Sequence, residues 1–243
     1  MMDSRLKCIT FDMDGCLVDT EAAYAKSWRT AFEFDGFPIE DQIINSWSGR
    51  GVTFINSEID KLTKDHERTM KLRQLREDNF FQALEAGQVE LKPYAREIIE
   101  FLKKENIKVG LVSSTYKGKG TRVLEYFRLL EKFDFTVFGD EVKNVKPSPE
   151  IYIEALKRSQ EKISDILVFE DSVSGVESAK AAGFTGIIHV PDSSVKNSQV
   201  NLDTFARVKD FSQGIELIKK IINNKDRGND EIRRVDYTLW SNS

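Results

Sequence analysis

Short apolar runs alternate with amphipathic segments over most of this chain. The runs are nearly continuous in valine, isoleucine, leucine and phenylalanine, as is typical of strands buried on both faces of a parallel sheet. They predict strands at residues 6–12, 108–113, 133–138, 165–171 and 186–190. Apolar residues at helical spacing between them predict helices at residues 95–104, 121–130, 151–158 and 173–182. This alternation predicts an α/β fold built on a doubly wound, Rossmann-like parallel sheet.

The interval from about residue 20 to residue 86 breaks the alternation. Its apolar positions follow helical spacing at 21–34 and 65–84, and it contains no strong strand pattern. A helical domain inserted between the first and second strands accounts for this. We therefore predict a core of residues 1–18 and 92–222, a cap of residues 19–91 and a tail of residues 223–243. Because the insertion leaves the sheet directly after the first strand, we expect it to cover that end of the sheet as a lid.

The last segment of the chain changes character. A charged, turn-rich stretch at residues 223–230 precedes four larger apolar residues, Val235, Tyr237, Leu239 and Trp240. Two interpretations stay open for it. It is either a loosely docked tail or a partner-binding segment anchored by Tyr237 and Trp240.

Composition and charge exclude several classes of protein. The chain has 243 residues and a formal net charge of −4, so it has no general electrostatic attraction to nucleic acid or anionic membranes. Its apolar runs are far shorter than the roughly 20 residues that span a bilayer, and its N-terminus lacks the apolar segment of a secretion signal. Cys8 and Cys16 are too far apart along an extended strand to form a disulfide, so free thiols are expected. We expect a soluble, cytoplasmic protein that works as a monomer.

Two carboxylates stand where the first strand gives way to a glycine turn. Asp12 and Asp14 are separated by one residue, and the alternation of side chains along a strand points both to the same side. In open α/β sheets, ligands bind at this carboxyl end of the strands. Two crowded acids repel one another unless a cation or a proton lies between them. The pair therefore predicts a Mg²⁺-assisted site in which one aspartate can act as a nucleophile.

Two other structures can contain the same pair of acids. An EF-hand loop also starts Asp-x-Asp, but it needs a glycine at its sixth position and a preceding helix. Here Gly15 is fourth and the preceding segment is a predicted strand. A strand followed by a turn with solvated acids is the remaining structural alternative.

Three further polar groups fall where predicted elements meet. Ser113 and Ser114 end the second strand, where hydroxyls and backbone amides ahead of a helix can hold a phosphate. Lys146 precedes a helix, and its charge can neutralise phosphoryl oxygens. Glu170 and Asp171 end an apolar strand, where acids are costly without a cation or another partner. Asp171 is therefore a candidate second ligand for a metal bound beside the first strand.

Taken in order, these motifs resemble those of the haloacid dehalogenase superfamily. They are Asp12-x-Asp14-Gly15, the strand-end Ser113, Lys146-Pro147 and Glu170-Asp171. The segments DMDGCLVDTE, KPSPEIY and FEDSVSGVESAKAAG are most similar to its β-phosphoglucomutase-like branch, which carries a helical cap after the first strand. The likeness spans roughly residues 5–222 and implies a Mg²⁺-dependent enzyme that acts on a small phosphorylated metabolite.

The resemblance also implies a role for each matching residue. Asp12 would attack phosphorus and form an aspartyl-phosphate, while Asp14 would protonate the leaving oxygen and later activate water. Mg²⁺ would be held by a carboxylate oxygen of Asp12, the backbone carbonyl of Asp14 and the carboxylate of Asp171. Glu170 would support these ligands. The expected phosphate- and substrate-binding residues are Ser113, Ser114 and Lys146 in the core and Tyr24, Trp28 and Arg50 in the cap.

Hydrolysis of a small phosphomonoester of a sugar, sugar acid or polyol is the expected reaction. A sugar-phosphate mutase is the alternative. Mutases of this branch usually carry a histidine at the position of Tyr24, and their basic residue after the second strand falls one place before Lys117. Both differences favour hydrolysis. A catalytically silent binding protein is a further alternative, and it would tolerate loss of Asp12 or Asp14. For Trp28, a place in the cap's own aromatic core is as good an interpretation as contact with the substrate.

Overall fold

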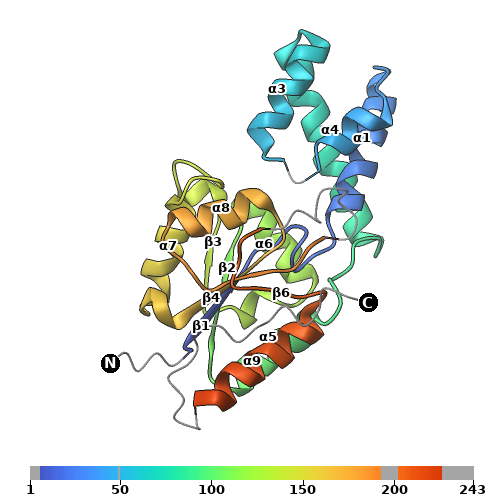
Figure 1. The fold of residues 1–243 in the computed structure, drawn as a ribbon. Coiled ribbons are helices and arrows are strands. Elements are labelled where there is room, and N and C mark those ends of the chain that lie inside the picture. The colour runs from blue at the N-terminus through green and yellow to red at the C-terminus, as the bar shows by residue number, and fades with distance from the viewer. Residues whose placement is uncertain (1–5, 49, 193–201, 226–243) are drawn as a thin grey trace.

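The computed structural model describes residues 6–48, 50–192 and 202–225, and its centre is a six-stranded parallel sheet (Figure 1). The strands are β1 (Cys8–Phe11), β2 (Lys108–Val112), β3 (Phe135–Val137), β4 (Ile166–Glu170), β5 (Ile187–His189) and β6 (Ala206–Arg207). Their order across the sheet is β3-β2-β1-β4-β5-β6. The sheet is therefore doubly wound, with its switch point at β1, where ligands bind in folds of this kind.

Helices cover both faces of the sheet and follow the strands in the predicted alternation. The core helices are α5 (Ala95–Lys104), α6 (Lys117–Tyr126), α7 (Glu150–Ser159), α8 (Val173–Ala181) and α9 (Phe211–Lys225), with short 3₁₀ turns at Leu130–Lys132, Gly139–Glu141 and Ile163–Asp165. One apolar cluster joins the sheet to α5 and α9, which lie side by side in Figure 1, and a second joins it to α7 and α8. The α/β prediction is confirmed.

The cap consists of helices inserted between β1 and β2. These are α1 (Glu21–Asp35), α2 (Asp41–Ser46), α3 (Val52–Thr63) and α4 (His66–Glu85). They have an apolar core of their own, in which Trp28, Phe32 and Trp47 pack together. Figure 1 shows α1, α3 and α4 standing away from the sheet at one end. The predicted helical insertion is therefore present.

Two chain segments connect the cap to the core, and they run beside one another. Val18 forms an antiparallel bridge with Leu91, and the Lys92 amide donates to the Leu17 carbonyl at 2.9 Å. The Lys92 ammonium pairs with Asp19 at 3.1 Å and with Asp192 at 2.9 Å. Lys92 thus ties both connecting segments to the core. The boundaries at residues 18/19 and 91/92 stay predictions.

Some elements differ from the sequence pattern. α6 begins at Lys117, four residues before the predicted start at Thr121, although Gly118 and Gly120 fall in its first turns. A Cβ at Gly120 would overlap the Phe138 ring, so this glycine lets α6 approach its neighbours closely. The strand β6 has only two residues, too few for a pattern, and α9 was not predicted as an element.

The ends of the chain fall partly outside the description. α9 continues to Lys225, so the first residues of the predicted tail are helical. Tyr237 and Trp240 lie outside the described residues. Within residues 6–48, 50–192 and 202–225, no helix has the length and apolarity to cross a membrane. Cys8 and Cys16 are both buried free thiols, as expected.

Candidate active site

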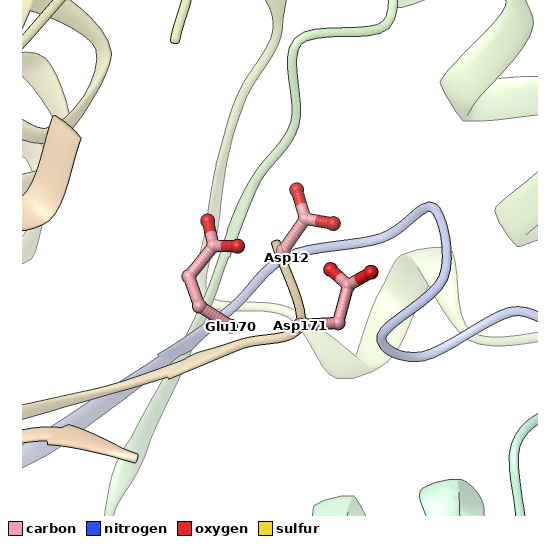
Figure 2. A group of neighbouring side chains, drawn as sticks. All are labelled: Asp12, Glu170 and Asp171. Carbon is pink, nitrogen blue, oxygen red and sulfur yellow. The ribbon is translucent and has the colours of Figure 1, made fainter. Parts of the chain in front are cut away.

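Three acids meet at the carboxyl ends of two neighbouring strands. Asp12 follows β1 directly, Glu170 ends β4, and Asp171 comes next. The pairing of β1 with β4 places Phe11 opposite Phe169, so the acids emerge at the same level of the sheet. One carboxylate oxygen from each lies within 4.8 Å of the others. Figure 2 shows the three side chains extending to one side of these strand ends.

Lys146 is the cation in contact with this cluster. Its buried ammonium donates to Asp12 at 2.5 Å, to Glu170 at 2.6 Å and to the Val112 carbonyl at 2.8 Å. Burial alone would lower the pKa of Lys146, but Asp12 and Glu170 raise it above its usual value. The buried Tyr152 hydroxyl also donates to Glu170, at 2.5 Å. The structure therefore brings Lys146 to the site, and it adds Tyr152, which the sequence patterns did not single out.

The acids carry more negative charge than Lys146 can neutralise. Burial, with the charges of Glu170 and Asp14, raises the pKa of Asp12 to about 8 against the opposing effect of Lys146. Burial and the charges of Asp12 and Glu170 raise the pKa of Asp171 well above its ordinary value. A bound cation would relieve this repulsion.

The residues present fit a Mg²⁺ ion. The Asp171 Oδ1 atom is buried and has no hydrogen-bond partner among the described residues. Glu170 Oε1 already accepts from Lys146 and Tyr152, so Glu170 is better placed to support the site than to bind the ion directly. A Cβ at Gly15, where φ is +82°, would overlap the Asp171 carboxylate. Carboxylate oxygens are the ligands that Mg²⁺ prefers, and those of Asp12 and Asp171 are available here.

Asp14 lies in a different environment from Asp12. β1 ends at Phe11, so strand alternation does not govern the position of Asp14. Its carboxylate accepts from the Tyr24 hydroxyl at 2.5 Å and from the Thr115 hydroxyl at 2.7 Å. Within the described chain, it is not part of the oxygen cluster around Asp171. Asp14 thus faces the cap, whereas Asp12 faces Lys146.

The loop between β2 and α6 supplies hydroxyls beside Asp14. Ser113 is buried, donates to Asp14 at 3.4 Å and accepts from the Thr115 amide at 3.1 Å. The Ser114 backbone carbonyl lies close to Gly139, and a Cβ at Gly139 would overlap the carbonyl oxygen. Thr115 was not among the expected binding residues. Its position two residues after Ser113, at the same strand end, was the signal for it.

The three cap candidates have different surroundings. Tyr24 reaches Asp14 across the boundary between cap and core. Trp28 is buried in the cap's aromatic core, 5.5 Å from the Trp47 ring. Arg50 is exposed, with its guanidinium 5.1 Å from the Phe54 ring centroid. The structure therefore brings Tyr24 to the acids, while substrate contacts by Trp28 and Arg50 stay predictions.

Comparisons with known proteins identify the family of this chain. Residues 6–183 match the family model of haloacid dehalogenase-like hydrolases. A phosphorylated carbohydrates phosphatase of Thermotoga maritima is 35% identical over 76% of this chain and 86% of its own length. The fructose-1-phosphate phosphatase YqaB of Escherichia coli is 25% identical over 76% of this chain and 97% of its own.

The same fold occurs in a solved β-phosphoglucomutase from Clostridium difficile. That structure covers 91% of this chain and 99% of its own, with a TM-score of 0.70 at 20% identity. A solved structure of a putative β-phosphoglucomutase from Thermotoga maritima is 29% identical and covers 91% of this chain and 99% of its own, with a TM-score of 0.67. The resemblance to the β-phosphoglucomutase-like branch with its helical cap is confirmed. This chain belongs to the haloacid dehalogenase-like hydrolases and is a phosphatase of that family.

Proposed function

We propose that this protein is a Mg²⁺-dependent phosphatase that hydrolyses a small phosphorylated carbohydrate or polyol through an aspartyl-phosphate on Asp12. The observation that carries the proposal is the separation of two neighbouring aspartates into two environments. Asp12 lies against Lys146 in the acid cluster, whereas Asp14 accepts hydrogen bonds from hydroxyls. Two carboxyls in different surroundings can take different roles, one as nucleophile and one as acid and base.

In the first step, an Asp12 carboxylate oxygen attacks phosphorus and the bond from phosphorus to the leaving oxygen breaks. Asp14, protonated at this stage, gives its proton to the leaving oxygen. The Lys146 ammonium, which contacts Asp12, stabilises negative charge on the transferring group. A Mg²⁺ ion held by Asp12 and Asp171 would add positive charge at the phosphoryl oxygens.

In the second step, a water oxygen bonds to phosphorus and the bond between phosphorus and Asp12 breaks. Asp14, now ionised, takes the water proton, so inorganic phosphate leaves and both aspartates return to their starting states. The Tyr24 and Thr115 hydroxyls donate to the Asp14 carboxylate and hold it in position at this stage. Hydrolysis is thereby complete with water as the acceptor.

The substrate class is supported by the relatives and by the cap. Two relatives are named for phosphorylated carbohydrates and for fructose 1-phosphate. Burial and the Asp14 charge raise the pKa of Tyr24 well above its ordinary value, so its hydroxyl stays protonated at neutral pH and donates to Asp14. A mutase of this branch usually has a titratable histidine at this position. The tyrosine therefore supports hydrolysis over phosphoryl return to a sugar.

Release of inorganic phosphate from a panel of small esters, with and without Mg²⁺, tests the proposal. We expect Mg²⁺-dependent release that the Asp12→Asn variant loses, because the amide is not a nucleophile. Asp203→Asn, at an exposed position outside the site, is the matched control and should keep wild-type release. Near-normal release by Asp12→Asn would overturn the mechanism. Conversion of a hexose 1-phosphate, dependent on a bisphosphate and without phosphate release, would point to a mutase.

A further inference from the structure

Two cations lie on opposite sides of the cap boundary beside Tyr24. Lys119 belongs to α6 in the core and Arg76 to α4 in the cap. The Lys119 ammonium and the Arg76 guanidinium each lie 4.1 Å from the Tyr24 ring centroid. Arg76 also lies 5.5 Å from the Trp28 ring. The hydroxyl of the same Tyr24 side chain donates to Asp14, the proposed acid and base, so Tyr24 lies between this cation pair and Asp14.

Lys119 and Arg76 together carry more hydrogen-bond donors than the surrounding carboxylates can accept. Glu77 contacts Arg76 at 2.5 Å and Lys119 at 3.3 Å, and no other carboxylate among the described residues pairs with either cation. The Arg76 Nε atom is buried and lacks a hydrogen-bond partner within the described chain. Lys119 otherwise faces the rings of Tyr24 and of Phe80, at 4.6 Å. Donors remain for a further acceptor.

Burial makes this arrangement costly for the empty protein. The Lys119 side chain is 4% exposed, and burial together with the Arg76 charge lowers the pKa of its ammonium to about 8. Arg73, one turn before Arg76 on α4, is a third cation. Burial and the charge of Arg76 lower its pKa. A purely structural position would be filled more cheaply by an apolar side chain. The cost indicates a ligand of opposite charge.

We propose that Lys119 and Arg76 bind a second anionic group of the substrate, at the end of the leaving group far from the phosphate that reacts at Asp12. This inference rests on the proposed function and narrows its substrate class to phosphate esters with a second phosphate or a carboxylate. Since one cation comes from the core and the other from the cap, such a group is held by both domains when the cap closes. Charge-assisted hydrogen bonds to phosphate or carboxylate suit both side chains.

Binding to the inactive Asp12→Asn protein, measured by calorimetry with Mg²⁺ present, tests this without turnover. Fructose 1,6-bisphosphate is compared with fructose 1-phosphate, and 3-phosphoglycerate with glycerol 3-phosphate. The first pair differs by a second phosphate and the second by a carboxylate. We expect the ester with the extra anion to bind at least about tenfold more tightly in one pair or both. The pair that responds identifies the anion.

Adding Lys119→Met should reduce that preference about tenfold, and Arg76→Met should do the same. The ratio within one protein cancels any general loss of folded material. Lys117→Met is the matched control, since Lys117 is exposed on the same helix and pairs with Glu141, so the preference should persist. Equal binding within both pairs, or a preference that survives both Met variants, would overturn the inference. The phosphate-release test of Asp12 is separate, so the proposed function can stand or fall independently.

Discussion

At the scale of single residues, surroundings rather than residue type separate the two aspartates. Asp12 and Asp14 are chemically identical and two positions apart, yet Lys146 contacts one and hydroxyls contact the other. Burial raises the pKa of Asp12 to about 8 despite Lys146. The charge of Lys146 is therefore a condition for folding this cluster, in addition to its proposed role in binding a phosphoryl group.

Lys146→Met should be both unstable and inactive. The change leaves Asp12 and Glu170 buried without the ammonium that contacts both. Breaking a buried ion pair in this way typically costs about 3–5 kcal/mol. Loss of a cation at the phosphoryl group should lower phosphate release about 100-fold or more. Urea unfolding and phosphate release measure the two effects. Lys143→Met, at an exposed position nearby, should behave as wild type, and a fully stable Lys146→Met would contradict the assignment.

Lys119→Met should stabilise the protein at neutral pH, and the gain should shrink as pH rises. The folded protein lowers the pKa of Lys119 from 10.5 to about 8, so the unfolded chain holds the proton more tightly. Wild-type folding therefore bears a penalty of roughly 3 kcal/mol below pH 8, which fades as pH rises toward 10.5. Methionine is similar in length and fits between the Tyr24 and Phe80 rings.

Urea unfolding of both proteins across this pH range gives the measurement. The difference in the free energy of unfolding should favour the variant most at pH 7. A constant difference at every pH would show that folding does not lower the pKa of Lys119. Higher stability together with weaker preference for a second anion would indicate that stability is sacrificed here for substrate recognition.

At the scale of elements, the start of α8 packs against Glu170 and so helps to position the acid cluster. Ser172 caps the helix by accepting from the Gly175 amide at 3.1 Å. Gly175 lies so close to Glu170 that a Cβ there would overlap its carboxylate. The glycine therefore allows the helix and the end of β4 to approach, and the carboxylate keeps its contacts with Lys146 and Tyr152.

Gly175→Ala should lower Mg²⁺ affinity and phosphate release by about tenfold or more, because Glu170 or the helix must move. Alanine is otherwise a better helix former than glycine by roughly 1 kcal/mol. Gly118→Ala in the first turn of α6 is the matched control. A Cβ there would make only ordinary contact with Tyr116, so activity should persist. Mg²⁺ titrations of activity compare the two variants, and unchanged kinetics in Gly175→Ala would refute the steric argument.

At the scale of the whole molecule, the cap and the core meet over the acids. From the cap, Tyr24 donates a hydrogen bond to Asp14 and Glu77 forms an ion pair with Lys119. In the second connecting segment, Lys92 forms an ion pair with Asp192. The candidate Mg²⁺ site, by contrast, consists of core residues alone, at the ends of β1 and β4. Metal binding should therefore stabilise the core.

Mg²⁺ should raise the unfolding temperature, and removal by EDTA should reverse the rise. A ligand at 100 times its dissociation constant stabilises the folded state by about 2.7 kcal/mol. Relief of the repulsion between Asp12 and Asp171 gives the physical reason. Thermal unfolding against rising MgCl₂, with KCl at equal ionic strength as control, measures it. Asp171→Asn should abolish the shift, and a shift that persists in that variant would place the ion elsewhere.

The strand ends and their acids could be predicted from the sequence because local patterns determine them. Asp12, Lys146, Glu170 and Asp171 are brought together, and their motifs also indicated the family. Asp14 was expected on the same side as Asp12, but β1 ends at Phe11 and Asp14 contacts Tyr24 and Thr115 instead. The start of α6 and the short β6 could not be predicted in this way. A glycine-rich helix start and a two-residue strand carry no periodic signal, and packing of the finished sheet decides both.

The sequence by itself determined the α/β alternation, the helical insertion and the chemistry of the strand ends, since periodicity and residue type act locally. Only the tertiary structure decided which side chains from distant segments meet. Tyr24, Arg76 and Lys119 come from a cap helix, another cap helix and a core helix, and their contacts depend on how the cap lies on the core. The charge and hydrogen bonding of such a cluster arise from burial and proximity, which no local pattern encodes.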